Sequence, residues 1–114
     1  MDISIIGSGY VGLTTGIVLA EKGHKVLCID KDKSKLQRLK KGELPIYEPG
    51  LQELLTKNLK SRSITFGNTI TQACNFGTAI FICVPTPTQA NGVSDLSFIE
   101  DVARNIALNL KALL

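Results

Sequence analysis

The sequence has few of the residues that build metal centres or redox pairs. Its 114 residues include no tryptophan, one histidine (His24) and three cysteines. Cys28, Cys74 and Cys83 form no C-x-x-C pair, and a single histidine cannot complete a zinc site of the usual spacing. We therefore predict no metal site and interpret the cysteines mainly as small apolar core residues. An odd number of free thiols is typical of a reducing, cytoplasmic setting.

Long apolar segments and a strong charge of one sign are also missing. No apolar run approaches the roughly 20 residues that are needed to cross a bilayer. Met1-Asp2 lacks the basic start of a signal peptide. The formal net charge of +3 is too small to indicate binding to nucleic acid or to a membrane surface. The length and composition favour one globular domain with one core.

The most informative segment is the glycine-rich run at residues 7–12, Gly-Ser-Gly-Tyr-Val-Gly. It follows an apolar run at residues 2–6, which predicts a strand, and precedes a predicted helix over about residues 10–22. A G-x-G-x-x-G pattern between a strand and a helix predicts dinucleotide binding. The inward face of this helix is predicted to consist of Val11, Thr14, Thr15, Val18 and Leu19.

Each glycine of this motif has a separate expected task. Gly7 allows a sharp turn off the strand because it has no Cβ. Gly9 leaves room for a pyrophosphate, and Gly12 lets the helix pack close to the strand. The phosphates would lie at the helix N-terminus, where the dipole favours an anion. The predicted cofactor-binding residues also include Tyr10, which lies inside the motif. The alternative interpretation of the motif is a tight turn that binds no ligand.

A second signal is Asp30, which ends the apolar run at residues 25–30 and lies 18 residues after Gly12. A carboxylate at this place accepts hydrogen bonds from the adenosine ribose and repels a 2′-phosphate, so it favours NAD over NADP. The alternative role is a helix N-cap, which Asp32 can supply instead. Lys35, one turn into the next helix, could reach back to the adenosine side. Its charge alone is equally typical of a solvated face.

The order of predicted segments defines the fold class. It predicts a Rossmann-type doubly wound fold of three α/β/α layers, with a parallel sheet in the strand order 3-2-1-4. The predicted strands are 2–6, 25–30, 63–66 and 77–84, and the predicted helices are about 10–22, 32–41, 51–59, 68–74 and 95–110. A dinucleotide fold normally has two halves, and the second is incomplete after the fourth strand and its helix. We therefore expect residues 1–114 to be the NAD-binding part of a longer protein, with an apolar sheet edge prone to self-association.

A proline-rich loop, Pro85-Thr86-Pro87-Thr88, follows the last apolar run. It lies at the carboxyl end of a strand, where open α/β sheets bind ligands. Thr86 offers a hydroxyl and a main-chain N–H to a cofactor. A stiff turn without a binding role is the alternative, and spacing alone does not choose between the two.

Three stretches together resemble one family. They are Ile-Gly-Ser-Gly-Tyr-Val-Gly-Leu at 6–13, Pro-Ile-Tyr-Glu-Pro-Gly-Leu at 45–51 and Val-Pro-Thr-Pro-Thr at 84–88. In order and spacing they are similar to the N-terminal NAD-binding domain of the UDP-glucose/GDP-mannose dehydrogenases. The resemblance covers essentially the whole chain. It implies an NAD-dependent oxidation of the C6 alcohol of a nucleotide sugar to a carboxylate with two NAD, and UDP-glucose is the favoured sugar. It also implies a homo-oligomer for the full-length protein.

The resemblance also assigns individual residues. It places Val11 in the phosphate-binding loop, Asp30 and Lys35 at the adenosine ribose, and Thr86 on the path toward the nicotinamide. Lys35 and Thr86 owe these roles to the resemblance and not to their spacing. Glu48 lies in the most specific of the three stretches, but neither its chemistry nor the resemblance indicates what it does.

The catalytic residues of the family are not matched in this sequence. The family's nucleophilic cysteine lies in a glycine-rich Cys-Phe-Pro-Lys context, which Cys28, Cys74 and Cys83 do not match. We therefore predict no catalytic residue in the chain and no turnover by the chain alone. A non-catalytic NAD-sensing domain and a hydroxyacid or hydroxyacyl-CoA dehydrogenase are the alternatives. The loops at 45–51 and 84–88 argue against both.

Overall fold

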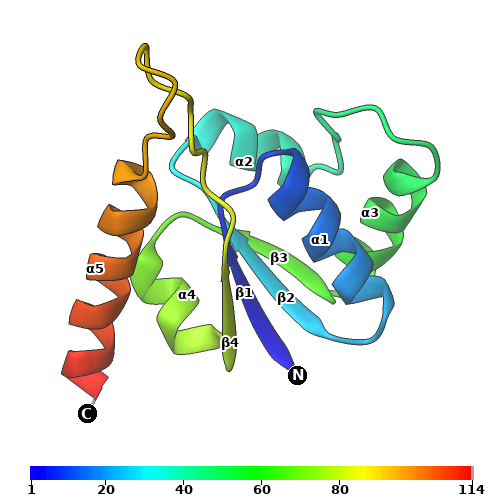
Figure 1. The fold of residues 1–114 in the computed structure, drawn as a ribbon. Helices are drawn as coiled ribbons and strands as arrows, with labels where there is room; N and C mark the ends of the chain where they lie inside the picture. The colour runs from blue at the N-terminus through cyan, green and yellow to red at the C-terminus, as the bar shows by residue number, and fades with distance from the viewer. Residues whose placement is uncertain (114) are drawn as a thin grey trace.

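The protein is a sheet of parallel strands covered by helices on both faces (Figure 1). The computed structural model describes residues 1–113, with side chains as far as Leu110. The strands are β1 (Asp2–Ile6), β2 (Lys25–Ile29), β3 (Ile64–Gly67) and β4 (Ala79–Ile82). Their order is β3-β2-β1-β4, and the paired strands are all parallel. The predicted fold class and strand order are confirmed.

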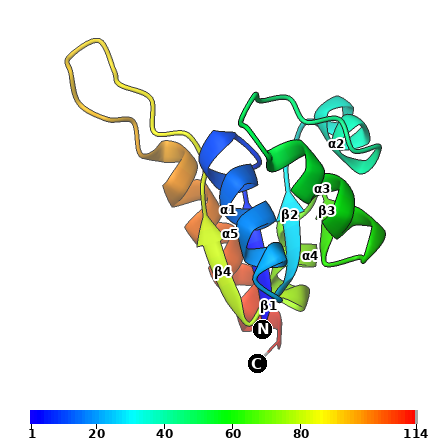
Figure 2. The same ribbon diagram turned by 90° about the vertical axis from the view of Figure 1, so that its right-hand side faces the viewer.

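The helices divide between the two faces of this sheet (Figures 1 and 2). They are α1 (Tyr10–Glu21), α2 (Lys33–Lys40), α3 (Leu51–Lys60), α4 (Ile70–Phe76) and α5 (Ser97–Leu113). The first three pack on one face, and α4 and α5 pack on the other. The fold therefore has the three layers that the alternation of segments predicts.

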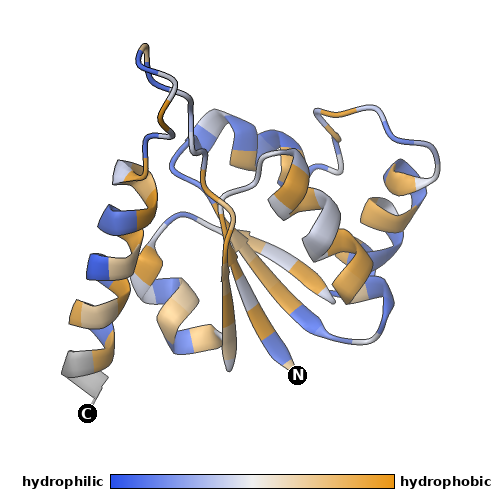
Figure 3. Ribbon diagram, in the orientation of Figure 1, coloured by the Kyte–Doolittle hydropathy of each residue, from blue (hydrophilic) through white to orange (hydrophobic). Residues whose placement is uncertain are grey.

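The side chains of β1 point alternately to the two faces of the sheet and so contribute to both cores. Ile3 and Ile5 face α1 to α3, whereas Ile6 faces α4 and α5. Apolar side chains line the inner surfaces of the helices and the strands between them (Figure 3). The Ser4 side chain is fully buried, and its hydroxyl donates to the Ala73 carbonyl oxygen at 2.6 Å. Each fully buried large aliphatic side chain contributes about 1.5–3 kcal/mol, so the two cores hold the sheet rigid beneath the loops.

The inward face of α1 differs from the prediction. Val11 and Val18 are 65% and 39% exposed. The buried residues are Gly12, Leu13, Gly16, Ile17 and Ala20. The buried face centres on Gly12 and Gly16, because the helix lies too close to its neighbours for a Cβ at either position, and Leu13, Ile17 and Ala20 lie on the same side of the helix.

The carboxyl ends of all four strands meet at one edge of the sheet, at the top of Figure 1. The glycine-rich turn, the segment after β2 and the loop after β4 all leave the sheet at this edge. In open α/β sheets, ligands bind at this edge, where the strand order reverses. Here the reversal lies between β1 and β4, because β2 and β3 follow on one side of β1 and β4 lies on the other.

Candidate functional site: the cleft above the sheet

The turn between β1 and α1 is built by Gly7. Its φ angle is +104°, a conformation that favours glycine, and its N–H donates to the Ile29 carbonyl oxygen at 2.9 Å. A Cβ placed here would lie 2.5 Å from the Cys83 carbonyl oxygen. Both the backbone angle and the lack of space therefore require glycine, and the chain turns sharply off the strand as predicted.

Gly12 and Gly16 let α1 approach the sheet. A Cβ at Gly12 would lie 2.0 Å from the Gly7 carbonyl oxygen, and one at Gly16 would lie 2.7 Å from Cys28 Sγ. Real Cβ atoms essentially never come this close to other atoms. Close packing of the helix on the strand is the role predicted for Gly12.

Gly9 differs from its neighbours because the space around it is open. A Cβ at this position would meet no described atom within 4 Å. Gly9 is the N-cap of α1, and the first backbone bond of the helix runs from Leu13 N–H to the Gly9 carbonyl oxygen at 2.9 Å. The N–H groups of residues 10–12 therefore precede the helical hydrogen bonds. Together with the open space at Gly9, these backbone donors form the kind of site at a helix N-terminus that binds phosphate groups.

Asp30 follows β2 and lies at the centre of a hydrogen-bond network. Its Oδ2 accepts from the Ser8 hydroxyl at 2.5 Å and from the Ser8 N–H at 3.1 Å, and its Oδ1 accepts from the Asp32 N–H at 3.0 Å. The Lys35 ammonium lies 3.5 Å from Oδ2. Burial disfavours the charged form of Asp30, but the bonds from Asp32 and Ser8 and the charge of Lys35 outweigh it and lower its pKa. The carboxylate is therefore ionised at neutral pH and joined directly to the glycine-rich turn.

The start of α2 sets the position of Lys35. Asp32 caps this helix, because its side chain accepts from the Lys35 N–H at 3.1 Å. Asp32 thus takes the N-cap role that was the alternative for Asp30. The cap places Lys35 in the first turn, and its side chain reaches back to Asp30.

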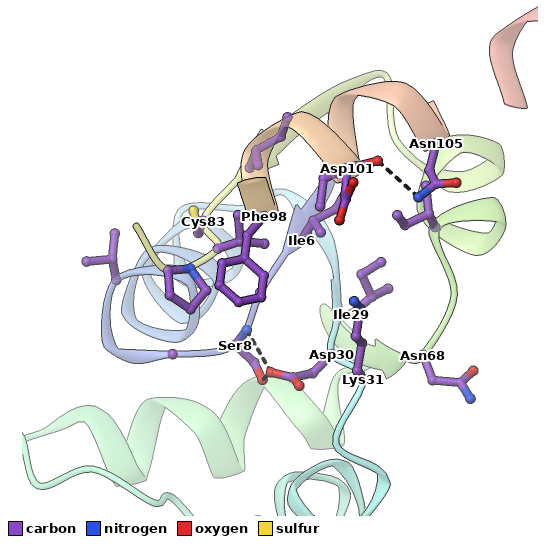
Figure 4. A pocket seen from close by; sticks show the side chains of 18 of the residues that line it. Ile6, Ser8, Ile29, Asp30, Lys31, Asn68, Cys83, Phe98, Asp101 and Asn105 are labelled. Atoms are coloured by element: carbon purple, nitrogen blue, oxygen red, sulfur yellow. Dashed lines mark hydrogen bonds between the residues drawn. The ribbon is translucent and has the colours of Figure 1, made fainter. Parts of the chain in front are cut away.

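A cleft of about 1050 Å³ joins these groups. Of the predicted cofactor-binding residues, Gly7, Gly9, Tyr10, Val11, Asp30, Lys35 and Thr86 line it. Gly12 is absent from the lining, in keeping with its packing role. Figure 4 shows Ser8 and Asp30 joined by a hydrogen bond on one side of the cleft. Phe98 and Asp101 of α5 come from another side.

Sequence analysis did not anticipate two parts of this site. The first is Ser8, which is 1% exposed and binds Asp30 through both its backbone and its hydroxyl. A small hydroxyl between two glycines was the available signal. The second is the wall formed by α5, by the start of α4 and by the loop before it, whose lining residues include Asn68, Thr71, Phe98, Asp101 and Asn105. No pattern in the sequence indicates that these segments converge on the cleft.

The three thiols are not suited to nucleophilic chemistry. Burial raises the pKa of Cys28 to about 12, and it also raises the pKa values of Cys74 and Cys83. Within the described part of the chain, no group of three His, Cys, Asp or Glu side chains could hold a metal ion. None of the described helices is long and apolar enough to cross a membrane.

Comparisons with known proteins agree on one family. Residues 1–113 match the UDP-glucose/GDP-mannose dehydrogenase family, NAD binding domain. The chain is 44% identical over 112 residues to a UDP-glucose 6-dehydrogenase of Rhizobium meliloti, a match that covers 97% of this chain and 26% of the relative. It is also 44% identical over 108 residues to the UDP-glucose 6-dehydrogenase TuaD of Bacillus subtilis, covering 95% of this chain and 23% of the relative.

Solved structures give the same result. A UDP-glucose dehydrogenase from Pyrobaculum islandicum has a TM-score of 0.91 at 36% identity, over 98% of this chain and 26% of that one. A GDP-mannose dehydrogenase from Pseudomonas aeruginosa has a TM-score of 0.89 at 38% identity, over 93% of this chain and 24% of that one. The chain thus spans about a quarter of the relatives that it matches. It belongs to the UDP-glucose/GDP-mannose dehydrogenase family, as its NAD-binding domain.

Proposed function

We propose that the cleft above the sheet binds NAD in an extended form across the glycine-rich turn. The N-terminal N–H groups of α1 and the open space at Gly9 would hold the pyrophosphate. Asp30 and Lys35 would hold the adenosine ribose, and Thr86 would lie toward the nicotinamide. The observation that carries this proposal is that Gly9, Asp30 and Thr86, which follow three different strands or turns of the chain, all line the same cleft.

The Asp30 carboxylate supports a preference for NAD over NADP. It is ionised and partly buried, and its Oδ1 accepts one hydrogen bond, so it retains acceptor capacity for a ribose hydroxyl. A 2′-phosphate at the same place would bring a second negative charge beside it. Lys35 offsets part of this repulsion but is already engaged with the carboxylate.

For the full-length protein we propose the oxidation of UDP-glucose to UDP-glucuronate. The relatives at 38–44% identity that are named UDP-glucose 6-dehydrogenase favour this sugar over GDP-mannose or UDP-N-acetylmannosamine. Because NAD supplies a two-electron acceptor, conversion of a primary alcohol to a carboxylate uses two NAD and one water and releases three protons. The residues of this chain would bind and orient the cofactor, and the catalytic groups would come from the rest of the protein. We further propose that this protein is a cytoplasmic homo-oligomer.

The test is to supply the full-length protein with UDP-glucose and NAD and to measure turnover from the absorbance of the NADH that forms. We expect two NADH for each UDP-glucose consumed. Turnover only with GDP-mannose or UDP-N-acetylmannosamine would overturn the choice of sugar. No NADH with any nucleotide sugar would overturn the proposed activity, and calorimetric titration with NAD alone would still test the cofactor site.

A further inference from the structure

The loop between α2 and α3 carries the most specific sequence stretch of the chain and has no part in the function proposed above. Its base is well fixed. Leu44 and Ile46 pack against the core, and the Gln52 amide donates to the Gly42 carbonyl oxygen at 2.6 Å. Its tip is exposed, and the Tyr47 side chain is 92% accessible. The tip therefore needs some other contact to hold it in one place.

That contact is a hydrogen bond to the start of α1. The Tyr10 hydroxyl donates to Glu48 Oε2 at 2.9 Å, across 38 positions of sequence. Tyr10 is the first residue of α1 and lines the cleft. The loop tip is thus joined directly to a residue of the candidate cofactor site.

The position of Tyr10 gives this bond a consequence for the cofactor. Its backbone N–H is among those that precede the helical hydrogen bonds of α1 and face a bound pyrophosphate. Tyr10 is also among the residues that line the cleft. Holding the hydroxyl restrains the side chain and, with it, the first turn of the helix. The Glu48 carboxylate is held at the far end of the tyrosine ring, so it does not compete with a phosphate for the helix N-terminus.

We propose that Glu48 is a positioning residue that acts through Tyr10 to pre-organise the dinucleotide cleft and to tie the loop at residues 42–50 to it. The inference rests on the proposed binding of NAD. Ordering an unrestrained tyrosine side chain when the cofactor binds would cost free energy. The bond to Glu48 orders the side chain beforehand, so this cost is not taken from the binding free energy. Glu48 has no contact with the cofactor in this account.

The experiment compares NAD affinities of the unsubstituted chain with those of Glu48→Ala, Glu48→Gln and Tyr10→Phe by calorimetric titration. We expect Glu48→Ala and Tyr10→Phe each to weaken binding by about three- to tenfold, the range of one lost polar contact. The double variant should be no weaker than the single ones, because both remove the same bond. Glu48→Gln keeps an acceptor oxygen and should restore most of the affinity.

Glu43→Ala is the matched control, since it removes an exposed carboxylate of the same loop that makes no side-chain hydrogen bond among the described residues. It should bind NAD as the unsubstituted chain does. A second readout does not use NAD at all. The chain has two tyrosines and no tryptophan, so in a Tyr47→Phe background the ultraviolet absorbance of tyrosinate reports Tyr10 alone. The hydrogen bond and the charge of Glu48 raise the pKa of Tyr10, and Glu48→Ala should bring it back toward its usual value.

The outcomes separate the two proposals. Equal NAD affinities for Glu48→Ala and the unsubstituted chain would overturn the positioning role and leave NAD binding intact. An unchanged Tyr10 titration in Glu48→Ala would also overturn it, because the contact would not exist in solution. Failure of the unsubstituted chain to bind NAD would overturn the proposed cofactor site and this inference with it.

Discussion

Asp30 is the residue on which we propose that the choice of cofactor depends. Its carboxylate accepts from the Ser8 and Asp32 backbones and lies 3.5 Å from the Lys35 ammonium. These partners hold it ionised at the end of β2, where an adenosine ribose would bind. A charge in this position both attracts the hydroxyl groups of NAD and repels the phosphate of NADP.

Replacing this carboxylate should therefore change both affinities. In Asp30→Ala we expect NAD binding to weaken by about tenfold or more, as for a lost hydrogen bond to a charged group. The preference for NAD over NADP should fall, because the repulsion is gone and Lys35 is released toward the phosphate. Calorimetric titration with each cofactor measures this, with Asp2→Ala at the other end of the sheet as the control. An unchanged NAD affinity would remove Asp30 from the site.

Ser8 is one of the groups that lower the pKa of this same carboxylate. Because the pKa of Asp30 is lower in the folded chain than in the unfolded one, its contribution to stability is present above the unfolded value of about 3.9 and is lost as the pH falls through the folded value. Ser8→Ala removes the hydroxyl bond and keeps the N–H bond. The folded pKa should rise, so the variant should lose that contribution at a higher pH.

Urea unfolding of both chains at a series of acidic pH values measures this shift. The two curves of unfolding free energy against pH should run parallel near neutrality, where the full contribution of Asp30 differs between the chains, and the gap between them should narrow as the pH falls through the two folded pKa values. Curves that remain parallel down to the acid limit would show that Ser8 does not act on Asp30.

The sequence predicted Asp30 but not its network, for a physical reason. Its spacing from the glycines follows from the geometry of a strand-turn-helix-strand unit, so it can be read from residue numbers. The middle residue of G-x-G can be any small residue, and nothing in the pattern says where its side chain points. The Ser8 contact is visible only once β1 and β2 lie side by side.

At the scale of elements, α1 shows that close packing at two positions decides which helix face is buried. The predicted inner face consists of Val11, Thr14, Thr15, Val18 and Leu19, but the structure buries Gly12 and Gly16 together with Leu13, Ile17 and Ala20. The distance between α1 and the sheet decides this. A helix that must deliver its N-terminus to the end of β1 lies too close to the sheet for a Cβ at Gly12 or Gly16.

Gly12→Ala tests this explanation. Alanine normally stabilises a helix interior by up to about 1 kcal/mol relative to glycine. Here its Cβ would lie 2.0 Å from the Gly7 carbonyl oxygen, and this backbone atom cannot move away as the end of a flexible side chain could. We expect a loss of about 2 kcal/mol or more in the free energy of unfolding, as for overpacking of a core. Denaturant unfolding measures it, with Thr15→Ala in the same helix as the control, and a Gly12→Ala chain as stable as the unsubstituted one would contradict it.

The wall of the cleft that α5 forms could be predicted only in part from the sequence. The apolar spacing of α5 predicted an inward face of Ile99, Val102, Ala103, Ile106 and Leu110. Val102 is 6% exposed and Ile106 packs against the same core, but Ala103 is exposed and Leu110 is 45% exposed, so the prediction holds for only part of the helix. The spacing does not give the angle at which α5 crosses the sheet. A long connection leads from β4 to α5 (Figure 2), and the first turns of α5 bring Phe98 and Asp101 to the cleft.

At the scale of the whole molecule, the two cores and the cleft are organised by the same sheet. The sheet carries α1 to α3 on one face and α4 and α5 on the other (Figure 1). The cleft is lined by residues from helices on both faces, among them Tyr10 of α1 and Phe98 of α5. The topology was predictable because parallel strands with right-handed crossovers allow few arrangements. Beyond β4 the sheet has an edge at which Phe81 and Ile82 are 41% and 38% exposed. Self-association through this edge stays a prediction.

The central claim is that this cleft binds a dinucleotide through the turn at Gly9. The most direct measurement is calorimetric titration of NAD into the unsubstituted chain and into Gly9→Ala, with thermal unfolding of both. A Cβ at Gly9 meets no described protein atom within 4 Å, so the variant should fold with nearly unchanged stability. The same Cβ enters the space proposed for the pyrophosphate, so NAD affinity should fall by at least about tenfold. A Gly9→Ala chain that binds NAD as tightly as the unsubstituted one would contradict the account.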